Sequence, residues 1–469
     1  MLSSTLSEVF KLEEAAIKLL LTVYAGYVLS LIHRTFLFAA PKIMQHIYFT
    51  FSGIGFLYWN YGWEVLHSLL CLSGQWFIFL IMGGSVYAVT TSFTFQMGYL
   101  IWGYVYSSTT GYDINWLIPQ CILTLRMIGL AFDVYDGHRN ENDLSPDQKQ
   151  RAIRDFPSLL EILGFNYLYC GYLVGPQYPL QRVRALVNGE LTDKPGQRPN
   201  SVIAGFRRGL TGSIVLGVQI SIGGIFYPYH FTTSEFQESG LFYKIGYIAV
   251  TGHSVMLRYI SIWIINEGAC IICGLGYVED GRTGKVRWDA VRNVTLHKFL
   301  FAQSFHDVIN SFNINTNEWV MRYVFKRLRF VGIRTVSHLS ALTFLAVWHG
   351  LHVGYFTCFA YEFLTITVEK QLITFLSNLW LVKLLKSAPA LSWIPSAVGF
   401  IYVHSLLGYS SIDFTLMIWE RYQPVHASVY YHGHIFFGML YVLLKLRPFL
   451  LFKKTSSEMT DNVTTKKTL

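Results

Sequence analysis

The sequence predicts an all-α, polytopic membrane protein, because long apolar runs dominate the chain and charged residues are few. Hydrophobic residues make up 52% of its 469 residues and charged residues only 14%, whereas soluble domains carry about a quarter charged residues. Runs such as 15–40 and 391–407 are predominantly apolar. They do not alternate in polarity, as the strands of a membrane β-barrel would.

A helix that crosses a bilayer needs about 20 predominantly apolar residues, and the chain offers about 11 candidate segments. The run at 241–277 is long enough for one steep helix or two, and the run at 373–385 is short. No internal repeat or linker is evident, so we predict a single transmembrane domain at 1–455 and a short tail at 456–469. The candidate segments are 16–38, 46–71, 76–100, 114–132, 163–180, 210–229, 241–277, 336–364, 373–385, 391–407 and 429–452.

The stretch 157–180 contains both helix-packing and helix-breaking signals. Gly171 and Gly175 have the spacing that lets a neighbouring membrane helix approach closely. Pro176 follows at once and would break a helix. Non-helical backbone at membrane depth is tolerated inside protein or beside a cavity, so we predict a bent or re-entrant segment that lines a chamber.

Positive charge is concentrated in three regions, and it predicts the orientation of the chain. The formal net charge is +9, and 181–208, 281–334 and the tail after Lys445 are basic. Basic loops stay on the cytosolic side, and they also suit anionic lipids or a polyphosphate; we predict no nucleic-acid partner. Lys466 and Lys467 resemble a dilysine retrieval signal of the endoplasmic reticulum, which requires a cytosolic carboxyl terminus. The glycosylation patterns at Asn293 and Asn462 would then go unused.

Two residue groups suggest metal chemistry but have simpler interpretations. Cys270 and Cys273 form a lone C-x-x-C without a second pair, so we interpret all six cysteines as small, reduced core residues. Asp133 and Asp136 lie at i, i+3 at the start of a polar loop, without a third carboxylate at matching spacing. A solvated loop or helix cap is favoured over a metal site.

The region 288–334 is the longest amphipathic stretch. Arg322, Lys326 and Arg329 fall on one helical face, and Phe325 and Leu328 help to form the opposite, apolar face. Such a helix lies at a membrane surface with its cations toward water. The region is either an interfacial helix without a ligand or a surface that meets a phosphate-bearing substrate from the cytosol.

His349 lies between Trp348 and Gly350 inside an apolar run, where a histidine is unfavourable unless a partner or a site uses it. His352 follows one turn later and raises the alternative of a di-iron site of the membrane desaturase type. That site needs several histidine clusters, and the chain adds only His432 and His434. We therefore predict no metal.

Three ordered stretches together carry a family resemblance: FDVYDG at 132–137, PSLLEILGFNYLYCGYLVGPQ at 157–177, and FNINTNEWVMRYVFKRLRFVG through WHGLHVGYF at 312–356. The set resembles the membrane-bound O-acyltransferase family, and within it the lysophospholipid acyltransferases, in particular those that act on lysophosphatidylcholine. The first hundred residues and the tail add little beyond hydropathy. WHG alone is a weak motif, but the ordered set is specific.

The resemblance implies a helical bundle with re-entrant or interfacial helices around a buried chamber, with a cytosolic tunnel for acyl-CoA and a separate opening for lipid. It places the catalytic pair on Asn313 and His349, although Asn315 and Asn317 lie close by. It implies transfer of an unsaturated acyl group from acyl-CoA to the sn-2 hydroxyl of a lysophospholipid, without a cofactor, in the endoplasmic reticulum membrane; a homodimer is left open. The substrate-binding candidates are Trp319, Arg322, Lys326, Arg329, Trp348 and His352, with a structural role as the alternative for His352.

Elementary chemistry agrees with these expectations. A hydroxyl is a poor nucleophile unless a base removes its proton as it attacks, and burial keeps an imidazole in its neutral, basic form. Asn313 either donates to the oxyanion of the tetrahedral intermediate or positions His349 or the acceptor. No Ser or Cys lies in a nucleophile motif beside His349, so we predict direct transfer without an acyl-enzyme.

Two other function classes remain as alternatives. One is a family member that acylates lysophosphatidylinositol, a sterol, diacylglycerol or a protein. The other is a transporter, which should show further ionisable groups along a membrane pathway. The sequence shows few such groups outside Glu267 and the histidines.

Overall fold

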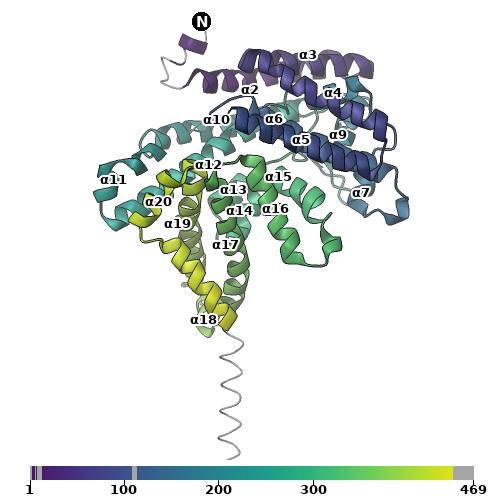
Figure 1. The fold of residues 1–469 in the computed structure, drawn as a ribbon. Helices are drawn as coiled ribbons and strands as arrows, with labels where there is room; N and C mark the ends of the chain where they lie inside the picture. Colours follow the sequence, from purple (N-terminus) through teal and green to yellow (C-terminus); the bar gives the residue numbers. More distant parts are fainter. Residues whose placement is uncertain (1–2, 6, 8–12, 108–112, 447–469) are drawn as a thin grey trace, which may run out of the picture.

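The computed structural model describes residues 3–5, 7, 13–107 and 113–446 of the chain. These residues form a bundle of helices with one two-stranded antiparallel hairpin (Figure 1). The first half contains α2 (Glu14–Ile32), α3 (Lys42–Tyr61), α4 (Val65–Met82), α5 (Val86–Tyr106), α6 (Leu117–Gly137), α7 (Pro146–Arg151), α8 (Leu159–Asn166), α9 (Leu180–Val187), α10 (Val202–Gly223) and α11 (Ser234–Glu238).

The second half begins with the long helix α12 (Leu241–Ile272) and the hairpin β1 (Val278–Glu279) and β2 (Val286–Arg287). The predicted tail at 456–469, with its dilysine, lies outside the described residues. The remaining helices are α13 (Leu296–Leu300), α14 (Phe305–Ser311), α15 (Ile314–Val320), α16 (Arg334–His349), α17 (Val353–Asn378), α18 (Trp380–Ser387), α19 (Ile394–Leu416), α20 (Trp419–Ser428) and a final helix His432–Leu446.

The helical, multi-pass membrane class predicted from composition is confirmed. Among the described residues, five helical stretches are long and apolar enough to cross a membrane, and a sixth counts if the bent pair formed by α20 and the final helix is one span. The expected total of about 11 segments, some of them re-entrant, stays a prediction. The five stretches are Glu14–Leu37, Lys42–Met82, Leu117–Gly137, Val202–Thr232 and Leu241–Ile272.

The first hundred residues divide differently from the predicted segments at 46–71 and 76–100. The structure has three helices there, because α3 and α4 each end at a glycine. Gly62 and Gly83 adopt φ angles of 60° and 59°, in the left-handed region that other residues rarely enter. Each glycine amide bonds back to the last turn of its helix.

A single helix, α12, lies at the centre of the bundle. Its 32 residues correspond to a length of about 48 Å, so it crosses a hydrocarbon layer of about 30 Å only at a steep tilt. It packs against α2, α10 and α19. The expected alternative of two helices at 241–277 is therefore wrong.

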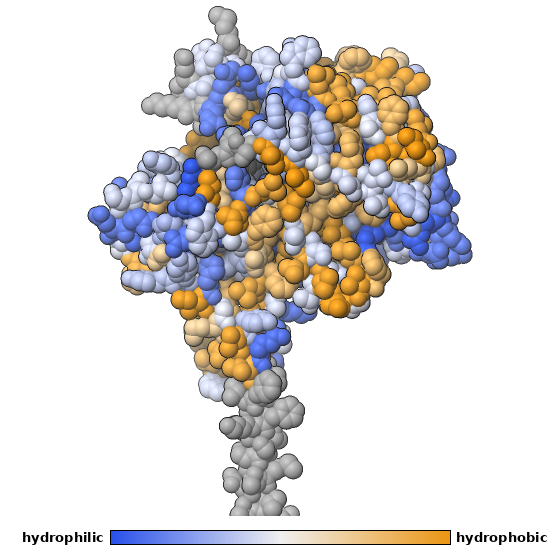
Figure 2. Space-filling view, viewed as in Figure 1, coloured by the Kyte–Doolittle hydropathy of each residue, from blue (hydrophilic) through white to orange (hydrophobic). Residues whose placement is uncertain are grey.

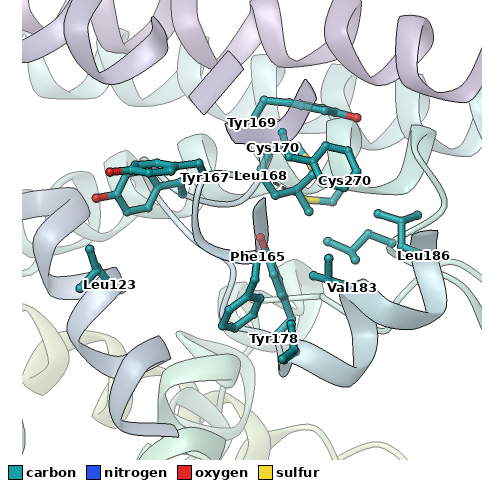
Figure 3. Packing of buried hydrophobic residues seen from close by; sticks show 14 of the residues in the cluster. Leu123, Phe165, Tyr167, Leu168, Tyr169, Cys170, Tyr178, Val183, Leu186 and Cys270 are labelled. Atoms are coloured by element: carbon teal, nitrogen blue, oxygen red, sulfur yellow. Dashed lines mark hydrogen bonds between the residues drawn. The ribbon is translucent and has the colours of Figure 1, made fainter. Parts of the chain in front are cut away.

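The segment after α8 is buried although it is not helical. From Tyr167 to Tyr178 it runs through the largest apolar core cluster, where Figure 3 shows it packed against Val183, Leu186 and Cys270. This confirms the expected irregular segment inside protein. The helix-packing role expected for Gly171 and Gly175 is wrong, because neither glycine lies in a helix.

An apolar outer surface covers the part of the bundle formed by α3 and α4. Figure 2 shows hydrophobic side chains gathered over this region, and Phe51, Trp63 and Ile81 are each more than two-thirds exposed. A soluble protein rarely exposes so large an apolar patch. The surface therefore faces lipid, as expected of a membrane protein.

Candidate functional site

A cavity of about 1180 Å³ opens between the helices. It is lined by parts of α2, α6, α10, α12, α14, α15, α16, α17 and α19, so the walls come from most of the chain. Its volume exceeds the roughly 300–1,000 Å³ of a typical small-molecule pocket. Asn313, Trp348, His349 and His352 all line it, so four of the predicted site residues are brought into one chamber.

Asn313 is held in an unusual backbone conformation at the start of α15. Its φ and ψ angles are 50° and 41°, in the left-handed region where asparagine is better tolerated than most residues. The side-chain nitrogen of Asn293 donates to the side-chain oxygen of Asn313 at 3.4 Å. The backbone N–H of Ile314 donates to the backbone oxygen of Asn293. Within the described residues, the side-chain nitrogen of Asn313 has no partner, so it is free to donate into the chamber.

The side chains of the neighbouring asparagines, Asn315 and Asn317, donate hydrogen bonds to backbone oxygens. Asn315 donates to the backbone oxygen of Val291 at 3.2 Å. Asn317 donates to the backbone oxygens of Ile309 and Phe312, at 3.0 Å each. The side-chain donor of Asn317 therefore holds α15 to the end of α14, and that of Asn315 holds α15 to the segment before α13.

A buried ion pair fixes the segment that carries Asn293. Arg208 of α10 donates to Glu267 of α12 and to the backbone oxygen of Val294, at 2.8 Å in each case. Glu267 is 2% exposed, and a buried carboxylate needs such a partner. Helices α10 and α12 thereby set the position of Asn293, the residue beside Asn313.

His349 is the last residue of α16, and aromatic rings surround it. Ring centroids lie 4.6 Å away for Trp348, 5.6 Å for Phe359 and 5.0 Å for Phe414. Its ring nitrogens have no hydrogen-bond partner among the described residues. Because the residue lines the chamber, these nitrogens are available to a ligand.

The sequence around His349 explains why the helix ends there. Gly350 has φ 140°, and a Cβ at this position would lie 2.9 Å from the Tyr355 ring. A residue other than glycine would be strained there. The expected span at 336–364 is consequently broken into α16 and α17, and the imidazole projects from the break.

Trp348 anchors this break. Its indole nitrogen donates to the backbone oxygen of Cys121 in α6 at 3.0 Å. The Tyr104 hydroxyl of α5 donates to the backbone oxygen of Trp348. Trp348 is 8% exposed, so most of its surface packs against protein. His352 forms the N-cap of α17 and packs near the Tyr355 ring.

The predicted cationic face does not form one long amphipathic helix. After α15 the chain continues as a π-helical turn, Met321–Phe325, and a short 3-10 turn, Arg329–Val331. Arg322 is bound by Asp147 and Glu318, at 3.0 Å each, while Lys326 lies 3.9 Å from Asp147. Within the described part of the chain, the Arg329 side chain has no such partner.

Trp319 and the three cations lie outside the lining of the large chamber. Trp319 is 5% exposed, and its ring stacks on Phe344 with centroids 5.5 Å apart. Trp319 and Arg322 line a second, much smaller cavity of about 70 Å³ instead, together with Arg126 and Arg182. Contact of Trp319 or the cations with substrate stays a prediction.

The expected solvated position of Asp133 and Asp136 is wrong. Both are buried at the end of α6. Tyr323 donates to Asp133 at 2.7 Å, and Arg327 forms an ion pair with Asp136. These bonds join two of the sequence stretches that carried the resemblance, FDVYDG and the basic segment after Trp319.

Neither the cysteines nor the histidines gather into a metal site. Among the residues that the structure describes, no group of three or more His, Cys, Asp or Glu side chains is placed to hold a metal ion. All six cysteines are free. The interpretation of all six as core residues is too simple, because Cys121 and Cys358 line the chamber.

Comparison with known proteins agrees with this arrangement. Residues 101–412 match the family model of the membrane-bound O-acyltransferases. The chain belongs to the membrane-bound O-acyltransferase family. Both Asn313 and His349 fall within the matched residues, as does most of the chamber wall.

Individual relatives are similar to this chain over three-quarters or more of its length. Lysophospholipid acyltransferase 5 of Mus musculus is 40% identical over 445 residues, which cover 92% of this chain and 88% of the mouse protein. The protein of the same name from Drosophila melanogaster is 36% identical and covers 90% of this chain and 85% of its own length. A lysophospholipid acyltransferase of Saccharomyces cerevisiae is 27% identical, covering 76% of this chain and 62% of its own length.

Two charged residues that line the chamber of this acyltransferase were not predicted from the sequence. Arg258 lies near the middle of α12, and Glu362 lies in α17, 13 positions after His349. Each is a single charge within an apolar run. That isolation was the signal that could have identified them, because an intramembrane charge is a functional candidate by default.

Proposed function

We propose that this acyltransferase transfers an unsaturated fatty acyl group from acyl-CoA to the free sn-2 hydroxyl of lysophosphatidylcholine, and also of lysophosphatidylethanolamine and lysophosphatidylserine. The observation that carries the proposal is the single chamber that Asn313 and His349 share. Relatives named lysophospholipid acyltransferases, similar over nine-tenths of the chain, support this acceptor class.

His349 acts as the general base. Its ring is packed among aromatic side chains, where the neutral imidazole is favoured over the charged form. The imidazole removes the proton of the sn-2 hydroxyl while the oxygen attacks the thioester carbonyl. The new ester C–O bond forms, the C–S bond breaks, and the proton passes from the imidazolium to the departing CoA thiolate.

Asn313 stabilises the negative charge that develops on the carbonyl oxygen. Its side-chain nitrogen is free of protein partners among the described residues, and Asn293 fixes its side-chain oxygen. A donor that is already oriented before the reaction stabilises an oxyanion without reorganisation. The left-handed conformation at Asn313 belongs to this arrangement, since strained backbone persists where the surroundings impose it.

The CoA phosphates bind at the cationic surface that follows α15. Of its three cations, Arg322 is already satisfied by Asp147 and Glu318. Arg329 and Lys326 are therefore the residues assigned to CoA, since both are exposed. Removal of the Arg329 charge should raise the KM for acyl-CoA most at low ionic strength, where surface charges are screened least.

The location and assembly of the protein are part of the same proposal. The basic regions support a cytosolic carboxyl terminus, and the resemblance of Lys466 and Lys467 to a dilysine retrieval signal supports the endoplasmic reticulum membrane. Lys466 and Lys467, which would act as the retrieval signal, lie outside the described residues. Light scattering of the detergent-solubilised protein would distinguish a monomer from a homodimer.

The test is acyl transfer in membranes that contain this protein. A labelled unsaturated acyl-CoA is supplied with a panel of lysophospholipids, and new diacyl product is measured for the wild type, His349→Ala and His306→Ala at equal expression. His306 is exposed and lies outside the chamber lining, so it is the matched control. Product from the wild type and the control, but not from His349→Ala, is expected. Full activity of His349→Ala would remove the base from the mechanism.

A further inference from the structure

Two opposite charges in the chamber wall have no protein partner. Arg258 of α12 and Glu362 of α17 both line the cavity. Within the described residues, neither side chain makes a hydrogen bond or an ion pair, and they are not paired with each other. Both lie within apolar stretches of their helices, where an unpaired charge is unfavourable unless it faces water or a ligand.

The buried acids elsewhere in the second half of the described chain each have at least one partner. Glu267 pairs with Arg208, and Asp413 pairs with His426. Glu369 accepts backbone N–H bonds from Phe305 and His306, at 2.7 Å and 3.1 Å. The lack of a partner at Glu362 is therefore a local property of the chamber.

Glu362 lies on α17, one turn after a residue whose ring packs against His349 at the end of α16. Phe359, whose ring stacks on His349 at 5.6 Å, is three positions earlier and so shares a helix face with Glu362. Three residues of an α-helix rise by about 4.5 Å. Glu362 thus lies about one helical turn along α17 from Phe359, the residue whose ring stacks on His349.

Arg258 lies in the wall contributed by α12. Val255 and Ile262, three positions before it and four positions after it, also line the chamber, which places Arg258 on the chamber face of its helix. The adjacent Tyr259 and Tyr355 of α17 both line the same chamber. The Tyr355 ring lies 5.8 Å from His349.

We propose that Arg258 and Glu362 recognise the head group of a zwitterionic lysophospholipid, with Arg258 binding the phosphate and Glu362 the ammonium group. This inference rests on the proposed function. A guanidinium pairs strongly with phosphate oxygens, and a carboxylate supplies the opposite charge for choline or ethanolamine. The chamber thereby selects choline and ethanolamine head groups over anionic head groups that lack a cation, such as inositol.

The same contact also orients the acceptor. In a lysophospholipid, the phosphate is attached to the glycerol carbon beside the carbon that carries the free hydroxyl. A phosphate held by Arg258 in the chamber wall therefore restricts where that hydroxyl can lie relative to His349, which lines the same chamber. Orientation of this kind is a large part of the advantage of a bound substrate.

The experiment compares Arg258→Gln and Glu362→Gln in the full-length protein. Initial rates are measured with lysophosphatidylcholine, lysophosphatidylethanolamine and lysophosphatidylinositol, and KM is measured for each lipid and for acyl-CoA. Glu420→Gln and Arg282→Gln are the matched controls, because both residues are exposed and lie outside the chamber lining.

Arg258→Gln should raise the KM for every lysophospholipid by roughly tenfold and leave the KM for acyl-CoA unchanged. Arg258→Lys, which keeps the charge, should restore part of the loss. Glu362→Gln should lower the preference for lysophosphatidylcholine over lysophosphatidylinositol by roughly tenfold. Because it removes an unpaired charge from the interior of the bundle, this variant should fold and melt no lower than the wild type.

An unchanged head-group preference in Glu362→Gln would overturn the inference. So would an Arg258→Gln variant whose KM rises for acyl-CoA and not for the lipid, because Arg258 would then face CoA. Either result leaves the wild type active on lysophospholipids. A wild type that is inactive with every lysophospholipid would instead contradict the proposed function itself, so the two failures are distinguishable.

Discussion

The indole nitrogen of Trp348 donates to the backbone oxygen of Cys121 at 3.0 Å, which joins the end of α16 to α6. A second bond, from the Tyr104 hydroxyl of α5, holds the backbone oxygen of the same tryptophan. The residue beside His349 is thus fixed from two helices. Because His349 itself makes no hydrogen bond within the described residues, its position depends on Trp348 and on the rings around it.

Trp348→Phe should therefore lower kcat more than it changes KM. The variant keeps an aromatic ring but loses the N–H donor, and a small displacement of a catalytic group costs on the order of tenfold to a hundredfold in rate. Steady-state kinetics with both substrates would measure this. Trp419→Phe, at an exposed tryptophan, is the control. A large rise in the KM for lysophospholipid at unchanged kcat would assign Trp348 to substrate binding instead.

Gly350→Ala should abolish most activity and lower the melting temperature. Gly350 has φ 140°, and the added methyl group would lie 2.9 Å from the Tyr355 ring. Either the turn after His349 or the Tyr355 ring would have to move. Gly55→Ala is the matched control, since its added methyl group would meet nothing within 4 Å. Activity assays and thermal unfolding in detergent would separate the two variants, and equal behaviour of both would contradict the argument.

The fold class could be predicted because it depends on a local signal: hydropathy indicates membrane helices wherever it is sustained. The family resemblance carried by the ordered motifs singled out Asn313 and His349, which both line the chamber. The breaks between helices were harder to predict. Gly62 and Gly83 end α3 and α4 through positive φ angles, but most of the other glycines that the structure describes do not have positive φ. Composition alone does not distinguish the glycines with positive φ from those without it.

The partners of charged side chains were harder still to predict, because the two members of a pair are separated by long stretches of chain. Arg322 looked free on a helical face, but Asp147, 175 positions earlier, binds it. A separation of 190 positions likewise concealed Tyr323 as the partner of Asp133. Conversely, Glu362 and Arg258 were not predicted as site residues, although each is a single charge in an apolar run. Only the three-dimensional arrangement shows which charges are satisfied.

The Asp136–Arg327 pair should contribute strongly to stability. Asp136 is 1% exposed, and loss of one partner from a buried pair leaves a charge uncompensated, at a cost of about 3–5 kcal/mol. Asp136→Asn and Arg327→Gln should each lower the melting temperature markedly, and the double variant should lose less than the sum of the two. Thermal unfolding of the single and double variants in detergent would measure the coupling.

The exposed pair Arg154–Glu141 offers the control for this cycle, since its side chains are 69% and 58% exposed. Such pairs contribute about 0–1 kcal/mol. Strict additivity in the Asp136–Arg327 cycle would show that the ion pair is not coupled in the folded protein. Any loss of stability in Arg327→Gln would then come from the lost packing of the guanidinium over the Phe132 ring, which lies 4.6 Å away.

Direct transfer can be tested at Cys358, because this thiol lines the same chamber as His349. If the acyl group passed through an enzyme thioester, Cys358 would be a candidate to carry it, and Cys358→Ser would be nearly inactive. We expect instead that Cys358→Ser keeps most of the wild-type kcat. Wild-type protein incubated with labelled acyl-CoA and no acceptor should carry no covalent label after denaturation. A label that survives denaturation and disappears in Cys358→Ser would replace the one-step mechanism with a two-step mechanism, in which His349 activates the thiol rather than the lipid hydroxyl.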